Sequence, residues 1–331
     1  MSKLVTIFGG SGFVGRYIAR RMAKAGWRVR VAVRRPNEAI FVKPYGVVGQ
    51  VEPVLCNIRD EASVRAALAG ADAAVNCVGT FDKGGKNNFD AVQHEGAARI
   101  ARLSAEEGVS RLVHISAIGA DPDGASAYAQ SKAAGEAAVL EAMPSAVILR
   151  PSVIFGQEDA FFNRFANMAR ISPFLPLFGA STKFQPVYVD NVAEAAEKAI
   201  LGDATAGVYE LGGPDVATFR SLMDMMLAVI NRRSVVLALP LWVGRVMGNC
   251  LDWAQILTGG LFQNSLLTKD QALSLASDNI VADDARTLAD LGVTPVAMQA
   301  VLPEYLWSFR PDGQYNTMIA SAKNLTIRDD Q

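Results

Sequence analysis

The sequence predicts an α/β fold, in which a doubly wound parallel sheet is combined with a smaller, mostly helical C-terminal region. Three observations lead to this prediction. Short apolar runs alternate with segments of helical periodicity from residue 4 to about residue 230. A glycine-rich turn joins the first apolar run to the first helical segment. The composition then changes, because residues 237–267 are rich in Leu, Trp, Met and Gly.

The alternation of strands and helices sets the predicted topology. Apolar runs predict strands that begin near residue 4 and then span residues 28–33, 50–55, 73–76, 111–115, 146–149, 184–190 and 208–211. Helices are expected over residues 13–25, 61–68, 89–107, 128–143, 192–201 and 218–230, and over a charge-interrupted apolar stretch at 241–257. Because such alternation produces parallel strands covered on both faces, the fold is expected to be Rossmann-type.

Composition and charge restrict the class of protein. Half of the 331 residues are apolar and the net charge is −1, which argues against a nucleic acid partner bound through a basic surface. Cys56, Cys77 and Cys250 are far apart and only two histidines are present, so we expect a reducing compartment and no metal site. The chain starts with a strand and has no apolar run of ~18 residues, so neither a signal peptide nor a transmembrane helix is expected.

The glycine-rich turn is the first candidate binding site. Gly9, Gly12 and Gly15, with Gly10 in addition, lie between a strand and a helix. Such a turn lets backbone N–H groups approach a pyrophosphate, and the helix N-terminus attracts the same anion. A turn that only packs the strand on the helix is the alternative, which the strand–turn–helix context disfavours. The candidate cofactor-binding residues here are Gly9, Gly10, Ser11, Gly12, Phe13, Val14 and Gly15.

Two arginines, Arg34 and Arg35, follow the second predicted strand. An NAD-specific fold usually has an acidic residue there, about 20 residues after the glycines, whereas an arginine accommodates the 2′-phosphate of NADP. The pair therefore favours NADP(H) over NAD(H), and two solvated arginines are the alternative.

The domain organisation follows from this pattern. Residues 1–150 are expected to form an NADP(H)-binding Rossmann core, to which residues 184–211 return. Residues 151–183 and 212–331 are expected to form the smaller C-terminal region, which docks partners. Its candidate docking surfaces are residues 173–178 and 242–262.

A tyrosine and a lysine stand four residues apart at the start of a predicted helix. Tyr128 and Lys132 would lie one turn apart on one helical face. A lysine ammonium in this position can lower the pKa of the tyrosine and can donate a hydrogen bond to a ribose. Spacing alone would suit a chance pair, but its place after the fifth strand of a dinucleotide fold favours a functional one.

Together these motifs resemble the short-chain dehydrogenase/reductase superfamily, in its extended or atypical branch. The resemblance covers residues 1–230 and rests on the glycine motif, on Tyr128-x-x-x-Lys132, and on Asn57-Ile58, Arg150-Pro151 and Val187–Ala193. It implies that the cofactor-binding set also includes Asn57, Ile58, Val78, Gly79, Ser116, Tyr128, Lys132, Pro151 and Ile154.

A narrower similarity is carried by residues 113–120, 131–136, 149–159 and 161–166. These stretches are similar to the nucleotide-binding accessory subunit family of respiratory complex I (NADH:ubiquinone oxidoreductase). The resemblance implies tightly bound NADP(H), held as NADPH, docking to complex I subunits near the quinone site, and peripheral contact with membrane lipid. Mitochondrial members carry an import presequence that this chain lacks, so we expect a bacterial form at the cytoplasmic face of the inner membrane.

The same resemblance bears on catalysis. In active members a serine positions the substrate oxygen, the tyrosine is the general acid/base and the lysine orients the ribose. Ser116 is the candidate serine, but the reactive serine usually lies one or two positions later, where this chain has Ala117 and Ile118. We therefore interpret Tyr128 and Lys132 as a vestigial pair that holds the cofactor in a non-catalytic subunit. The alternatives are a free NADP(H)-dependent reductase or epimerase of a small carbonyl or quinone compound, and a redox-sensing regulator.

Overall fold

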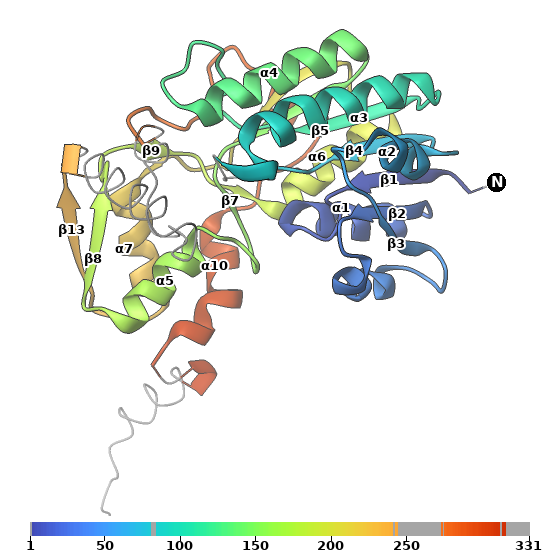
Figure 1. Cartoon of the computed structure of the whole chain (residues 1–331). Helices are drawn as coiled ribbons and strands as arrows, with labels where there is room; N and C mark the ends of the chain where they lie inside the picture. Colours follow the sequence, from blue (N-terminus) through green and yellow to red (C-terminus); the bar gives the residue numbers. More distant parts are fainter. Residues whose placement is uncertain are drawn as a thin grey trace, which may run out of the picture.

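The computed structural model is built around a seven-stranded parallel sheet (Figure 1). It describes residues 2–80, 84–240, 242–243, 273, 275–311 and 313–315. In spatial order the strands are β11 (Gly207–Leu211), β6 (Val147–Pro151), β5 (Arg111–Ile115), β4 (Ala73–Asn76), β1 (Leu4–Phe8), β2 (Arg28–Val33) and β3 (Val51–Leu55). The predicted α/β class and the parallel sheet are therefore confirmed.

Helices cover both faces of this sheet. One face carries α1 (Phe13–Lys24) and α6 (Val189–Leu201), and the other carries α2 (Glu61–Leu68), α3 (Glu95–Glu106) and α4 (Ala127–Ala142). Strand β1 is buried along its whole length, with Val5 and Ile7 in the core beneath α1 and α6 and with Leu4 and Phe8 in the opposite core. This burial on both faces explains why four of the five residues of β1 are apolar.

A C-terminal lobe packs beside the sheet around its own core. Its elements are β7 (Ile154–Phe155), α5 (Phe162–Ile171), β8 (Phe174–Phe178), β9 (Lys183–Phe184), β10 (Val187–Tyr188), β12 (Ala217–Thr218), α7 (Phe219–Val229), β13 (Val235–Leu239) and α10 (Met298–Leu306). Phe161, Phe165 and Phe219 pack ring against ring, with centroids 5.4–5.6 Å apart. Aromatic residues of this region therefore build a core.

The structure departs from the predicted elements in several places, and strands β8 and β13 were not predicted. Residues 184–190 were expected to be one strand, but they form β9, β10 and the start of α6. Two irregular helical segments also occur: the 3-10 segment η1 (Pro36–Tyr45), and the π-helical turn η3 (Asp90–His94) at the start of the helix expected over 89–107. Short 3-10 turns complete the described elements at Gly85–Asn87, Ala289–Leu291, Trp307–Phe309 and Gly313–Tyr315.

Part of the predicted C-terminal docking region lies outside the described residues, namely 244–262 and with it most of the helix expected over 241–257. The other candidate surface contains β8, which pairs with β13 and leaves Phe174 exposed. No helix in the described part of the chain combines the length and apolar character needed to cross a membrane. The division into a core of residues 1–150 with 184–211 and a separate C-terminal region stays a prediction.

Candidate functional site

The glycine-rich turn packs so tightly that it leaves no room for a side chain at Gly15. A Cβ atom there would meet the carbonyl oxygen of Gly9 and would lie 2.7 Å from the Cα of Gly10. Gly9 has a φ of +74°, and its carbonyl accepts a hydrogen bond from the Gly12 N–H at 2.9 Å. Helix α1 begins directly after Gly12, and its first turn contains no acidic residue. The turn and the helix N-terminus therefore form the type of site that binds an anionic pyrophosphate.

Most of the other candidate residues follow neighbouring strands of the same sheet, whereas Ile154 lies in β7 of a separate two-stranded sheet. Because the strands are parallel, their carboxyl ends meet at one edge, and β1 and β4 mark the point where the strand order reverses. Contact there is close, since the Val78 side chain would lie 3.3 Å from a Cβ atom on Gly9. In spatial order the candidates are Asn57 and Ile58 after β3, Arg34 and Arg35 after β2, Gly9–Gly15 after β1, Val78 and Gly79 after β4, Ser116 after β5, Pro151 at the end of β6, and Ile154 in β7.

The two predicted phosphate-binding arginines differ in their contacts. The Gly9 N–H donates a hydrogen bond to the Ala32 carbonyl at 2.9 Å, which holds the end of β2 beside the glycine turn. Arg35 Nη1 forms an ion pair with Glu38 Oε1 at 3.0 Å. The exposed side chain of Arg34 has no ion pair or hydrogen bond with any residue that the structure describes. Arg34 is therefore the freer of the two to bind a ligand phosphate.

Ser116, Tyr128 and Lys132 come together at the carboxyl end of β5. Lys132 Nζ donates a hydrogen bond to the carbonyl of Ile115 at 3.2 Å and lies 5.9 Å from the centroid of the Tyr128 ring. Tyr128 packs edge-on against Phe89, with 6.0 Å between the ring centroids. The Ser116 hydroxyl is buried and has no hydrogen-bond partner within the described part of the chain. Such a group is uncommon in a folded protein, and here it is available to a bound ligand.

Burial dominates the pKa values of the Tyr–Lys pair. It raises the pKa of the Tyr128 phenol to about 12 and lowers that of the Lys132 ammonium to about 8, although Glu136 and Cys77 act to raise the latter. The phenol is therefore protonated at neutral pH. The expectation that the ammonium lowers the pKa of Tyr128 is wrong in this structure, because desolvation of the phenolate outweighs any attraction by the lysine.

Two buried polar residues, Asn76 and His114, were missed by the sequence analysis. Asn76 Oδ1 accepts the Val78 N–H at 3.0 Å, and Asn76 Nδ2 lies 3.1 Å from His114 Nδ1. The amide NH₂ therefore donates to the histidine, so Nδ1 is unprotonated and the proton resides on Nε2. Burial and the nearby Lys132 lower the pKa of His114 to about 3. The sequence did contain one signal that could have identified this pair: a histidine stands among the apolar residues of the predicted strand over residues 111–115.

The buried neutral histidine predicts acid sensitivity. His114 has a folded pKa of about 3 against an ordinary value of 6.5, so the unfolded chain binds more protons between these values. Stability is therefore lost as the pH falls through this window, by about 2 kcal/mol between pH 7 and pH 5. Urea unfolding at both pH values should show this loss in the wild type and in His94→Gln, which alters the exposed histidine. His114→Leu should lack it, and an equal loss in His114→Leu would refute this assignment.

A second missed contact joins the glycine turn to the loop after β7. Arg16 Nη2 donates to the carbonyl of Ser11 at 3.1 Å, and Arg16 Nη1 forms an ion pair with Glu158 at 3.1 Å. The Tyr17 hydroxyl also donates to Glu158, at 3.0 Å. Nothing in the sequence pairs these residues, which are 142 and 141 positions apart.

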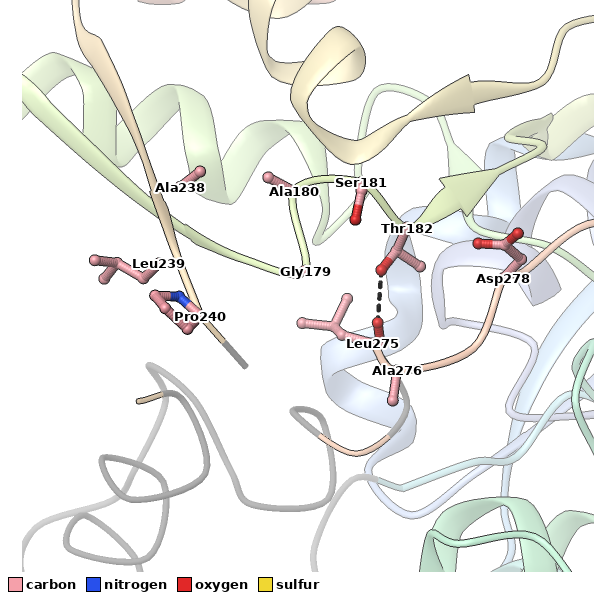
Figure 2. Close-up of a pocket in the computed structure, with 10 residues that line it drawn as sticks. All are labelled: Gly179, Ala180, Ser181, Thr182, Ala238, Leu239, Pro240, Leu275, Ala276 and Asp278. Carbon is pink, nitrogen blue, oxygen red and sulfur yellow. Dashed lines mark hydrogen bonds between the residues drawn. The ribbon is translucent and has the colours of Figure 1, made fainter. Parts of the chain in front are cut away.

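An open pocket of about 510 Å³ lies in the C-terminal lobe, between the ends of β8 and β13 and the segment 275–278 (Figure 2). Figure 2 shows Thr182 pointing toward this segment, where its hydroxyl donates to the Leu275 carbonyl at 2.6 Å. None of its described lining residues is a residue of the glycine turn or of the Ser116–Tyr128–Lys132 group. The pocket is thus a separate feature from the predicted nucleotide site.

Residues 5–212 match the family model of the NAD dependent epimerase/dehydratase family. The chain belongs to this family. It is 34% identical over 316 residues, 94% of its length, to "NADH dehydrogenase (ubiquinone) 1 alpha subcomplex subunit 9, mitochondrial" of Arabidopsis thaliana, covering 79% of that protein. It is also 30% identical to "Ceramide reductase" of Caulobacter vibrioides, over 72% of this chain and 74% of that protein. The resemblance derived from the sequence motifs is thereby confirmed.

The fold is also similar to that of solved structures. The UDP-glucose 4-epimerase of Thermus thermophilus, solved in complex with NAD, superposes with a TM-score of 0.66 over 93% of this chain and 99% of the epimerase, at 19% identity. Membership of the NAD-dependent family defines a nicotinamide dinucleotide as the class of cofactor for this site. The residues fit such a cofactor, since the glycine turn is free of side chains and the buried Ser116 hydroxyl lacks a partner.

Proposed function

We propose that the chain is an NADP(H)-binding accessory subunit of respiratory complex I that holds its cofactor without turning it over. The observation that carries this proposal is the extent of similarity. The family model ends at residue 212, whereas the match to the Arabidopsis complex I subunit covers 94% of the chain and so continues into the C-terminal lobe. The match to the Caulobacter reductase covers 72% of the chain. Similarity beyond the nucleotide fold favours the role of a subunit over that of an enzyme sharing only this fold.

The proposed cofactor contacts follow from the arrangement of the strand ends. Gly9–Gly15 would hold the pyrophosphate, Arg34 and Arg35 the 2′-phosphate, and Lys132 with Tyr128 the ribose of the nicotinamide. The remainder of the cofactor site would be lined by Asn57, Ile58, Val78, Gly79, Ser116, Pro151 and Ile154. A phenol with a pKa of about 12 is a weak proton donor at neutral pH, which agrees with a pair that binds the cofactor rather than transfers a proton.

We propose that a subunit with this role acts at the cytoplasmic face of a bacterial inner membrane, in peripheral contact with it. The test is to tag the chromosomal copy, solubilise the membranes gently and resolve them on a native gel. We expect the tagged chain to migrate with subunits of complex I identified by mass spectrometry. Recovery of the chain solely as a free soluble protein would refute the proposal.

Cofactor preference gives a separate prediction. Replacing Arg34 and Arg35 together with alanine should weaken NADPH binding about 10- to 100-fold, because a charge-assisted contact to the 2′-phosphate is lost, and should leave NADH binding nearly unchanged. Of the single variants, Arg34→Ala should show the larger effect, since Arg35 is paired with Glu38. Fluorescence titration with both nucleotides measures this. Equal losses for NADPH and NADH would count against NADP(H).

A second candidate function is an NADP(H)-dependent reductase of a lipid or other carbonyl compound. The similarity to a ceramide reductase and the convergence of Ser116, Tyr128 and Lys132 favour it. In this case Tyr128→Phe should abolish turnover of carbonyl substrates while retaining nucleotide binding. Unchanged turnover across a broad panel of such substrates would remove this candidate.

A further inference from the structure

The positive charge of the chain is concentrated in its first 58 residues. They contain ten Lys and Arg against two Glu, a net charge of +8, whereas the complete chain carries −1. Residues 59–331 therefore carry −9. Arg34 and Arg35 are candidate residues of the nucleotide site and Arg16 contacts the glycine turn, but several other cations are not among these residues. An asymmetry of this size points to a surface that attracts an acidic ligand or partner.

Four of these cations are exposed and form no ion pair with any residue in the described part of the chain: Arg20, Lys24, Arg28 and Lys43. Arg21 lies between Arg20 and Lys24 in the sequence of α1. Unlike these two residues, it forms ion pairs with three carboxylates of α6. The exposed acid nearest in sequence to Arg28 is Glu38, which forms an ion pair with Arg35. The next one along the chain, Glu52, lies on β3 beyond β2. The exposed side of α1 and β2 therefore carries uncompensated positive charge.

Exposed apolar residues lie among these cations. The segment 36–50 runs along α1, because Phe41 packs beneath the Arg16 guanidinium at 4.8 Å and Gln50 Nε2 donates to the Ala23 carbonyl at 2.6 Å. Val47 is 74% exposed and Val48 is fully exposed. In Figure 1 this part of the molecule, in blue, lies at the opposite end from β8 and β13. Apolar side chains grouped on a surface in this way mark interaction sites, whereas single exposed ones do not.

A hollow of about 510 Å³ lies next to the exposed valines. Its lining includes Val47, Val48 and Gln50 together with Ala23 and Arg28. A side chain of a protein partner can fill such a hollow, whereas a lipid surface has no projecting group of fixed shape to do so. The combination of a hollow, an apolar rim and unpaired cations therefore favours a protein surface over a membrane.

We propose that this basic-apolar face, defined by Arg20, Lys24, Arg28, Lys43, Val47 and Val48, binds a protein partner that presents carboxylates around an apolar side chain. The apolar side chain occupies the hollow beside the valines, and the carboxylates pair with the cations. The charge complementarity orients the two proteins and speeds their association. This inference rests on the proposed function, because the partner is another subunit of the respiratory complex.

The test uses respiratory complex I purified from a strain that lacks this chain. Purified wild-type protein is titrated onto it and binding is measured at low and at physiological salt. We expect Arg28→Glu/Lys43→Glu and Val48→Asp to weaken binding about 10- to 100-fold, and wild-type binding to weaken as salt rises. All variants should keep NADPH affinity and unfolding midpoint, because the changed side chains are exposed. The matched control, Arg170→Glu/Arg220→Glu, makes the same charge change on α5 and α7 and should bind within about threefold of wild type.

The possible results separate the two proposals. Failure of the wild type to bind the complex would refute the proposed function itself. Binding of the wild type together with unchanged binding of both face variants would refute only this inference. An equal loss in the control would show that net charge, rather than this face, governs binding. Vesicles of phosphatidylglycerol serve as the lipid probe, and binding to them that the same face variants abolish would make a membrane the occupant and overturn the proposal.

Discussion

A Gly15→Ala variant is expected to lose nicotinamide nucleotide affinity by at least about 100-fold and stability by about 2–4 kcal/mol. The added Cβ would meet backbone atoms of Gly9 and Gly10, which cannot rotate away as a side chain could. Relief requires the turn to move from the start of α1, and this displaces the N–H groups that would face the pyrophosphate. Titration with NADPH and urea unfolding measure the two effects separately.

Gly26→Ala is the matched control for this variant. Gly26 follows the end of α1 with a φ of +82°, and a Cβ there would have no atom within 4 Å. The same substitution should therefore destabilise by about 1 kcal/mol through backbone strain alone and leave nucleotide affinity unchanged. If Gly15→Ala bound NADPH as well as Gly26→Ala does, the glycine turn would not be the pyrophosphate site.

The fold was predictable wherever local sequence and tertiary burial agree. Strands β2, β4 and β5 have the predicted bounds, because most of their residues are buried and apolar residues mark both faces of each strand. The prediction failed where a residue that is distant in the sequence determines the local structure. The helix expected over residues 192–201 begins three residues earlier, at Val189, so that Asp190 lies inside its first turn and forms an ion pair with Arg21 at 2.8 Å. No local pattern reveals a partner 169 residues away.

The candidate site was predictable in its backbone but not in its electrostatics. The sequence correctly locates residues that follow parallel strands, because the order of strands brings their ends to one edge. It could not reveal that Arg35 pairs with Glu38 while Arg34 forms no ion pair with any residue that the structure describes, or that burial raises the pKa of Tyr128. Desolvation depends on what packs around a group, here including Phe89, and spacing in a motif does not contain that information.

An Arg150→Met variant is expected to destabilise the protein by about 3–5 kcal/mol. Arg150 binds Glu136 through Nε at 2.9 Å and Nη2 at 2.6 Å, and Glu136 on α4 is buried. Removing the guanidinium leaves this carboxylate buried without its cation. The effect extends to the site, because Glu136 lies one turn after Lys132 and helps to raise the pKa of its ammonium. Loss of Arg150 removes the contact that positions Glu136 beside Lys132, so NADPH affinity should fall together with stability.

The double variant Glu136→Gln/Arg150→Met should recover most of this loss, because it removes the buried charge along with its partner. Arg102→Met is the matched control. Arg102 forms equally short ion pairs, at 2.6 and 2.7 Å, but its side chain and those of its partners are exposed. Because solvent screens exposed pairs, its loss should destabilise the protein far less than the loss of Arg150. Equal destabilisation by Arg150→Met and Arg102→Met would contradict the argument that burial, rather than the number of ion pairs, makes the Arg150–Glu136 contact hold α4 against β6.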